Sequence, residues 1–373
     1  MRKKWCCSVI VLWIIVSLAS GCGKNNEFPK INHSSEEQKE MEKDVAEDFP
    51  ESYSKTSESG KVIFDCSLEV PENLEKPVIH RMTVQGKNMI DQEKAYQIYV
   101  EGKEISEKHV LPAGNGDPEE TTYILSDGSH CTIGNGIVVT GKNSLYYGEV
   151  SVDDGDYMEY YKDDTVDFKT GEECIQEVKT ALEELGYQLE DFIFQAYPVN
   201  HKSMEQVEMN KLQEELIQEK HKKSSWGPED DGYVIYAYQQ CENIPIFHER
   251  MSMNRMFSYE TPDNAPIQAI CSTRGIETLY TLESYDVVME EEQIYLKDFQ
   301  EIAQAVEDKF ENILNDATYK VIKAKLYQMV RYNEKQQYEV QPVWRFEILE
   351  NDSTSTKSVT LINGETGKEI FLN

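Results

Sequence analysis

The sequence carries little positive charge for its size, and this deficit argues against two classes of partner. Its 373 residues include 37 Lys and Arg but 69 Asp and Glu, so the formal net charge is −32 at pH 7. Nucleic acids and anionic lipid surfaces are polyanions, and a chain of this charge is not expected to bind either. The charge is compatible with a soluble exported domain, a basic partner or divalent cations.

Cysteine is sparse, and none of it is spaced as a zinc site. Three of the eight Cys, including Cys22, lie in the first 22 residues. The other five form no CxxC or CxxH pair, which predicts no metal site. Their apolar or β-type neighbours favour a role as small buried hydrophobes, although an exported chain can also form disulfides. An odd number leaves at least one thiol unpaired within the molecule; the five are Cys66, Cys131, Cys174, Cys241 and Cys271.

An apolar run at the N-terminus is too short for a confident membrane span. Basic residues at positions 2–4 precede the run, which extends from Trp5 to Leu18, whereas a span needs about 20 apolar residues. Small residues then lead to Cys22. A basic start, a short apolar core and small residues at the end predict a secretory signal over residues 1–21.

The end of this run resembles the signal of a bacterial lipoprotein. Leu18-Ala19-Ser20-Gly21-Cys22 is similar to a lipobox, with Ala19 where Leu is commonest. The resemblance implies that Cys22 becomes the lipid-bearing first residue, with a palmitate-type anchor in the membrane. It also implies that the protein lies on the outer face of the cytoplasmic membrane. An uncleaved anchor helix and a plain secretory signal are the alternatives. A single acyl chain binds weakly, so stable anchoring needs more than one.

Residues 22–60 are polar and acidic, with few large apolar side chains. Such composition predicts that the lipidated Cys22 is followed by a disordered tether, because the segment has little to bury. A flexible chain of this length spans roughly 35 Å on average. We therefore expect the folded part to begin near Lys61 and to stand off the membrane.

An N-terminal α+β unit is predicted over residues 61–168. Turn signals separate several β-rich runs, and Asp91–Val100 reads as a short helix that ends before Gly102. The expected strands are Val62–Phe64, Val78–Val84, Thr121–Leu125, Ile133–Thr140 and Ser144–Val150.

A middle module is predicted over residues 169–290, and its first helix has a distinct start. Thr170 and Glu173 fit a capping box, and one apolar face recurs up to Leu185. A second, polar helix is expected from Met204 to Lys223. The expected strands are Phe192–Val199, Tyr233–Gln239, Ile267–Ser272 and Ile276–Leu282.

A C-terminal module over residues 291–373 repeats this order. Asp298 opens a helix with a strong apolar period that includes Phe299, Ile302 and Val306. Strands are expected at Lys320–Tyr332 and around Trp344, with a final hairpin turning at Gly364–Gly367. Trp344, Phe346 and Ile348 should face the helix, whereas Arg345 and Glu347 should point to solvent. Helix followed by antiparallel sheet, twice over, predicts an α+β fold.

The C-terminal module resembles a PepSY-type module. An aromatic-centred strand, Tyr338–Phe346, follows the helix, and the hairpin turn after it carries Thr366-Gly367. The middle module matches less fully, through its helix and the segments Tyr233–Tyr236 and Ile270–Ile276.

The doubled arrangement is similar to the extracytoplasmic YycH and YycI proteins, which are membrane-anchored regulators of a sensor kinase. It is also similar to uncharacterised lipoproteins of Gram-positive anaerobes. The resemblance implies a fold rather than an activity, and no functional residue is carried over from it.

These features predict a cell-surface lipoprotein, held to the membrane through Cys22, that acts as a non-catalytic binding or regulatory module. The expected partner is an extracytoplasmic protein or peptide, with no nucleic acid, cofactor, metal or catalytic residue. A lipoprotein that binds a small ligand or a divalent cation is the alternative. A hydrolase is the third possibility.

The segment from Glu149 to Asp167 interleaves acidic residues with Tyr. Calcium or a basic peptide could use such side chains, but the spacing is not that of an EF-hand, and a solvated linker is the simpler interpretation.

Three shorter fragments resemble parts of catalytic or binding motifs, but each is more simply interpreted as ordinary secondary structure or a turn. His130-Cys131 reads as strand, Ser52-Tyr-Ser-Lys55 lacks the companion motifs of a serine acylase, and Gly134-Asn-Gly136 reads as a turn.

Overall fold

The computed structural model describes residues 49–373 apart from short gaps at 72–73, 75–76, 114–118, 151–159, 242, 249–264, 282–283, 333–336 and 372–373. The predicted signal, Cys22 and the first part of the predicted tether lie outside the described residues. Within the described part of the chain, no helix combines the length and apolar character needed to cross a membrane.

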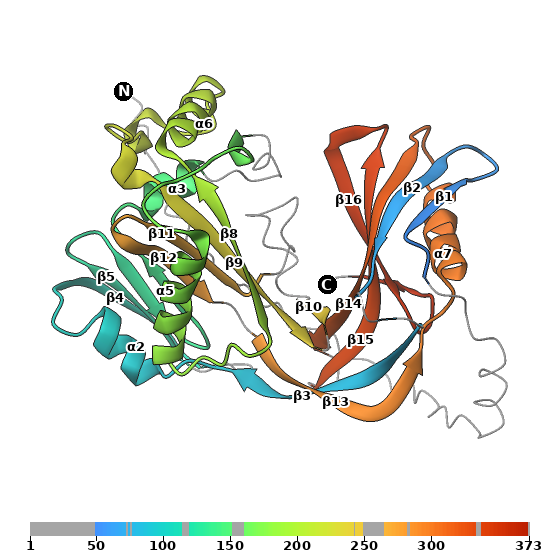
Figure 1. Cartoon of the computed structure of the whole chain (residues 1–373), viewed down its shortest axis with the longest axis horizontal. Coiled ribbons are helices and arrows are strands. Elements are labelled where there is room, and N and C mark those ends of the chain that lie inside the picture. Colours follow the sequence, from blue (N-terminus) through green and yellow to red (C-terminus); the bar gives the residue numbers. More distant parts are fainter. Residues whose placement is uncertain are drawn as a thin grey trace, which may run out of the picture. The chain divides into compact units, whose positions relative to one another are not determined.

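The predicted α+β class is confirmed, because helices pack on large, mostly antiparallel β-structure (Figure 1). The helices are α2 (Gln92–Tyr99), α3 (Ser144–Val150), α5 (Gly171–Glu184), α6 (His201–Gln213) and α7 (Phe299–Glu311). The strands are β1 (Ser52–Thr56), β2 (Val62–Glu69), β3 (Val78–Asn88), β4 (Ile105–Leu111), β5 (Glu120–Leu125), β6 (His130–Ile133), β7 (Ile137–Thr140), β8 (Phe192–Val199), β9 (Gly232–Cys241), β10 (Ile244–His248), β11 (Ile267–Ser272), β12 (Gly275–Thr281), β13 (Ser284–Tyr295), β14 (Tyr319–Tyr332), β15 (Tyr338–Glu350), β16 (Ser353–Asn363) and β17 (Glu369–Ile370).

One run of hydrogen-bonded strands has the order β4-β5-β6-β7-β12-β11-β9-β8, and α5 lies across it (Figure 1). Helix α5 begins at the predicted capping box, in which Thr170 accepts from the Glu173 backbone and Glu173 accepts from Thr170. Its buried face, including Val178 and Leu182, packs on β8, β9 and β12. The predicted strands at 192–199, 233–239 and 267–272 are therefore confirmed.

The other run follows the predicted helix-then-sheet order. Strands β14, β15, β16 and β17 form antiparallel neighbours, and α7 contributes Phe299, Ile302 and Val306 to the core beneath them. Trp344 lies in the same core, 5.0 Å from Phe299 between ring centroids. The predicted burial of the Trp344 face against this helix is confirmed.

Strand pairing crosses the predicted module boundaries near residues 168 and 290. Strand β7 pairs with β12, β3 pairs with β13, and β2 runs parallel to β14. Strand β10 pairs antiparallel with β9 through Ile244 and Pro245, and then pairs in parallel with β14 through Ile246–His248. The three-module division stays a prediction from sequence, but the segment 61–168 supplies strands to both later modules.

The predicted disordered tether does not extend to residue 60, because folded structure already includes β1. Strand β1 pairs antiparallel with β2 through Ser52–Thr56. Tyr53 supplies the reason, because its ring packs on Phe64 and Phe299 at centroid distances of 5.4 and 5.3 Å. Phe49 packs on Trp344 in the same core. Two aromatic side chains offset the polar composition of the segment.

The predicted strand at Ser144–Val150 is wrong, because these residues form α3. The backbone N–H of Tyr147 donates to the carbonyl of Asn143, which starts the helical turn. Tyr147 and Val150 are both buried against Trp226 and its neighbours. Their spacing of three residues fits one helix face, and an extended chain would place them on opposite faces.

Other segments differ in length or were missed. The predicted helix at 204–223 is shorter and earlier, because Asn200 caps α6 and its helical hydrogen bonding ends at Gln213. The predicted strand at 133–140 is two strands, β6 and β7, joined at the expected turn. Strands β4, β10 and β13 had no clear sequence signal.

Candidate functional site

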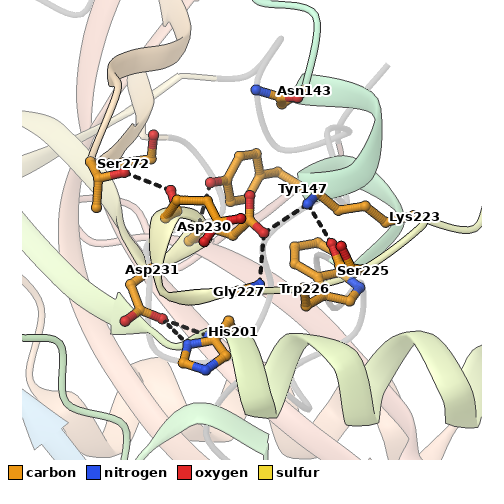
Figure 2. A network of polar contacts seen from close by, with 12 residues as sticks. Asn143, Tyr147, His201, Lys223, Ser225, Trp226, Gly227, Asp230, Asp231 and Ser272 are labelled. Atoms are coloured by element: carbon orange, nitrogen blue, oxygen red, sulfur yellow. Dashed lines mark hydrogen bonds and ion pairs between the residues drawn. The ribbon is translucent and has the colours of Figure 1, made fainter.

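A buried network of charged side chains centres on Asp230, in the short turn before β9 (Figure 2). Asp230 is 1% exposed. One carboxylate oxygen accepts from Lys223 Nζ at 2.7 Å and from the Gly227 backbone at 3.0 Å. The other accepts from Arg274 Nη1 at 3.1 Å. Burial raises the pKa of Asp230, but the hydrogen bonds and charges of Lys223 and Arg274 outweigh it and hold that pKa below its usual value.

Arg274 connects this turn to the β11–β12 hairpin and to α3. Its Nε donates to Glu277 at 2.5 Å, and its Nη2 donates to the Tyr147 hydroxyl at 3.1 Å. The Tyr147 hydroxyl donates in turn to the Asp230 carbonyl at 3.0 Å. Glu277 is buried and also accepts from Ser272.

Helix α6 joins the network through Glu208, which is 1% exposed. Its carboxylate accepts from Trp226 Nε1 at 3.1 Å and from the Lys223 backbone at 2.8 Å. The Lys223 ammonium lies 5.1 Å from the centre of the Trp226 ring. His201 and Asp231 pair at 2.6 Å at the start of α6. The network therefore holds α3, α6, the 223–231 segment and the β11–β12 hairpin together.

No motif in the sequence predicts this network. The Gly227-Pro228 pair marks a fixed turn, which is the local signal available. The partners Tyr147 and Arg274 come from segments far away in the chain, so the network is a product of tertiary structure.

Strand β4 supplies a different feature, an exposed edge. Among the described residues it is the last strand in its sheet order, and it pairs with β5. Each of its seven residues is exposed, including Val110 at 49% and Leu111 at 63%. The pairs Lys108–Tyr123 and Val110–Thr121 lie opposite each other, so Lys108 and Val110 share a face with Tyr123.

Helix α2 extends this face through a contact of Tyr96 with Tyr123 of β5. The Tyr96 ring packs 5.4 Å from the Tyr123 ring, and Lys108 Nζ lies 5.4 Å from the centre of the same Tyr123 ring. Tyr96 is more than a third exposed. We name Tyr96, Lys108, Val110 and Tyr123 the β4 edge surface.

The acidic stretch from Glu149 to Asp167 is described only in part, because residues 151–159 lie outside the described residues. Asp164 accepts from the Asn200 backbone at 2.7 Å and from Ser203 Oγ at 2.6 Å, which fixes the start of α6. Glu149 pairs with His221 at 2.9 Å. In the described ranges, no cluster of three or more His, Cys, Asp or Glu is placed to hold a metal ion.

The structure places the three short fragments in β6, in the turn after β6 and in β1. Cys131 is buried in β6 and His130 is exposed, so these neighbours point to opposite faces. Gly134–Gly136 forms the turn between β6 and β7. The fragment Ser52–Lys55 lies on β1 and not in the tether, and Lys55 pairs with Glu307 of α7.

The predicted exposure of Arg345 and Glu347 is wrong, since they are 7% and 6% exposed. Both faces of β15 are covered, one by the Trp344 core and the other by a second apolar cluster that includes Val343. Arg345 Nη1 donates to Glu347 at 2.6 Å, and Lys357 pairs with the same carboxylate. Burial raises the pKa of Glu347, but the charges and hydrogen bonds of Arg345 and Lys357 outweigh burial. The pKa of Glu347 therefore lies below its usual value.

No protein-family model matches the sequence, and no curated protein matches it. Among solved structures, the chain is similar to an uncharacterized protein from Eubacterium rectale ATCC 33656, with 14% identity and a TM-score of 0.58. That match covers 90% of this chain and 99% of the other. A further match is the YpeB C-terminal domain of Bacillus megaterium, with 11% identity, a TM-score of 0.28, and 76% and 95% of the two chains covered. The first match shows a shared fold, and function is not established by either.

Proposed function

We propose that this protein is a lipid-anchored, non-catalytic binding module on the outer face of the cytoplasmic membrane. It takes an extended segment of a basic extracytoplasmic protein or peptide as an added strand along β4. The anchor is the lipid on Cys22, and the partner is selected by the β4 edge surface.

The observation that carries the binding mode is the exposed edge strand. A strand hydrogen-bonded on one side presents a row of backbone donors and acceptors, which an extended peptide can pair with. Side chains on alternate positions of that peptide then meet the flanking face, where Tyr96, Val110 and Tyr123 supply apolar contact. Backbone pairing gives affinity, and these side chains give specificity.

The sign of the partner follows from charge. The chain carries a formal net charge of −32, so a basic segment is attracted and an acidic one repelled before contact. Attraction between opposite charges mainly accelerates association and is screened by salt. Binding should therefore weaken as the salt concentration rises.

A crosslinking experiment in intact cells tests the proposal. A photoreactive phenylalanine analogue replaces exposed His109 of β4, and in a second strain it replaces Val359 of β16, which is 40% exposed. We expect a crosslinked basic protein at position 109 and none at 359. Equal crosslinking at both positions would contradict strand addition at β4.

A charge substitution supplies the matched control. Val110→Lys places a positive charge where a basic segment docks, and Val359→Lys places the same charge at an exposed position of β16. We expect Val110→Lys to reduce the crosslinked product from position 109 about tenfold, with Val359→Lys without effect. An unchanged product in Val110→Lys, with the fold intact, would remove the β4 edge surface from consideration.

A further inference from the structure

Two thiols from distant parts of the chain meet in the core under α5. Cys174 lies near the start of α5 and Cys271 lies in β11. Both side chains are fully buried in one apolar cluster. Cys271 Sγ lies against the Glu177 side chain, one helical turn after Cys174 on α5, so β11 meets α5 beside Cys174; both thiols are free in the structure.

The surroundings of the pair keep it protonated once the protein has folded. Burial raises the pKa of both thiols, and the Glu177 carboxylate, 3.5 Å from Cys271 Sγ, further opposes a thiolate at Cys271. Glu177 is held in place by an ion pair with Lys169. Because a thiolate is the reactive form, the buried pair exchanges slowly in the folded protein. Any bond between the two sulfurs is therefore made while the chain is folding.

We propose that Cys174 and Cys271 form a disulfide during folding of the exported protein, which fastens the start of α5 to β11. The proposal rests on the extracytoplasmic location in the proposed function, since export places the thiols where disulfides persist. The oxidant is a small or protein disulfide, written RSSR.

The exchange has two steps. The Cys174 thiolate attacks one sulfur of RSSR, which forms a mixed disulfide and releases RS⁻. The Cys271 thiolate then attacks Cys174 Sγ, which forms the Cys174–Cys271 bond and releases the second RS⁻. The two protons lost by the cysteines convert both RS⁻ to RSH. Two electrons pass from the cysteine pair to RSSR.

The bond would close a long loop, because the two cysteines are roughly a hundred residues apart. Cross-links over such loops restrict the unfolded chain strongly, so the oxidised protein should be the more stable form. Cys131, buried in the same cluster on β6, is the matched control thiol.

Differential labelling of the full-length protein tests the proposal. The protein is isolated from membranes, unfolded without reductant, and alkylated with iodoacetamide; it is then reduced and labelled with N-ethylmaleimide. We expect Cys174 and Cys271 to carry the second label at least about tenfold over the first, and Cys131 to carry the first. The first label on both cysteines would overturn the proposal.

Refolding the reduced protein with oxidised glutathione separates this result from the location on which it rests. If the bond forms in vitro but the thiols are free in cells, the pair can bond and the cellular compartment does not supply the oxidant. This outcome would overturn the disulfide in cells. Free thiols after both treatments would overturn the disulfide itself and leave the binding proposal untouched.

A thermal measurement completes the test. We expect reductant to lower the unfolding midpoint of wild type by about 5 °C and of Cys131→Ala by the same amount. The double variant Cys174→Ala, Cys271→Ala should not respond to reductant. A wild-type midpoint that is insensitive to reductant would contradict a structural disulfide.

Discussion

Trp344 is the side chain on which the C-terminal core is built. It is fully buried, and its ring packs on Phe299 from α7 and on Phe49 from the segment before β1. Its indole N–H has no hydrogen-bond partner among the described residues. The contribution of Trp344 to stability therefore comes from volume and ring contact.

We expect Trp344→Ala to lower the free energy of unfolding by about 3–5 kcal/mol, because it leaves a cavity where three elements meet. Trp344→Phe should cost clearly less, since it keeps an aromatic ring and loses no hydrogen bond. Denaturant titration monitored by circular dichroism measures both. Equal losses for the two variants would show that ring packing is not the dominant contribution.

Ionisation of Asp230 should make the stability of its hydrogen-bonded network depend on pH. Its pKa is held below the usual value for Asp, so its charged form is favoured in the folded state. The stability that this contributes is present above the pKa of the unfolded chain, about 3.9. It is lost as the pH falls through the lower folded-state value.

We predict that Asp230→Asn lowers the free energy of unfolding at pH 7 by about 1–3 kcal/mol, because Lys223 and Arg274 lose a buried partner. The deficit relative to wild type should begin to shrink below about pH 4, where Asp230 of the unfolded wild-type chain takes up a proton, and should go on shrinking as the pH approaches the lower folded-state pKa. Thermal unfolding between pH 7 and pH 3 measures this. Asp65→Asn, in an exposed pair with Lys320, is the control and should change little. A deficit that stays constant over this range would contradict the assignment.

Helix α5 shows how an element can be specified by its own ends. Its capping box supplies hydrogen-bond acceptors for backbone N–H groups that lack a helical partner in the first turn. Its buried apolar face is formed by residues of the helix itself. Strand β1 is the opposite case, because a polar segment of this length becomes a strand through pairing with β2 and contact of Tyr53 with α7.

The cap gives a prediction at this scale. Thr170→Ala should lower the free energy of unfolding by about 1 kcal/mol, as is typical for loss of an N-cap side chain. Thr180→Ala, at an exposed position within α5, should be neutral or slightly stabilising because Ala is the better helix former. Urea denaturation of both variants checks the difference. If Thr180→Ala costs as much as Thr170→Ala, the cap is not the cause.

At the scale of the whole molecule, the proposed function places a folded acidic body outside a membrane on a lipidated chain. Cys22→Ser should move the protein from the membrane fraction to the soluble fraction and abolish labelling with a palmitate analogue. Cys241→Ser, at a half-buried position in β9, should leave both unchanged. Partition of the Cys22→Ser protein into the detergent phase would refute lipid attachment at this residue.

Much of the architecture could be predicted because its signals are local. Capping residues, an apolar period of 3.6 and alternation on strands all act over a few residues, and these located α2, α5, α7 and the strands that flank them. The candidate site could not be predicted in the same way. Asp230 has only a turn signal nearby. The exposure of β4 arises because, in the part of the chain that the structure describes, β5 is its one partner in the sheet order.

Interactions between neighbours along the chain specify the α+β class, both ends of α5, the start of α7 and the burial of Trp344. Tertiary structure alone decided that Arg345 and Glu347 are buried, because β15 is covered on both faces by residues that are distant in sequence. It also made a helix of Ser144–Val150 and placed Cys271 against α5. Periodicity specifies which side chains share a face, whereas the fold specifies what covers that face.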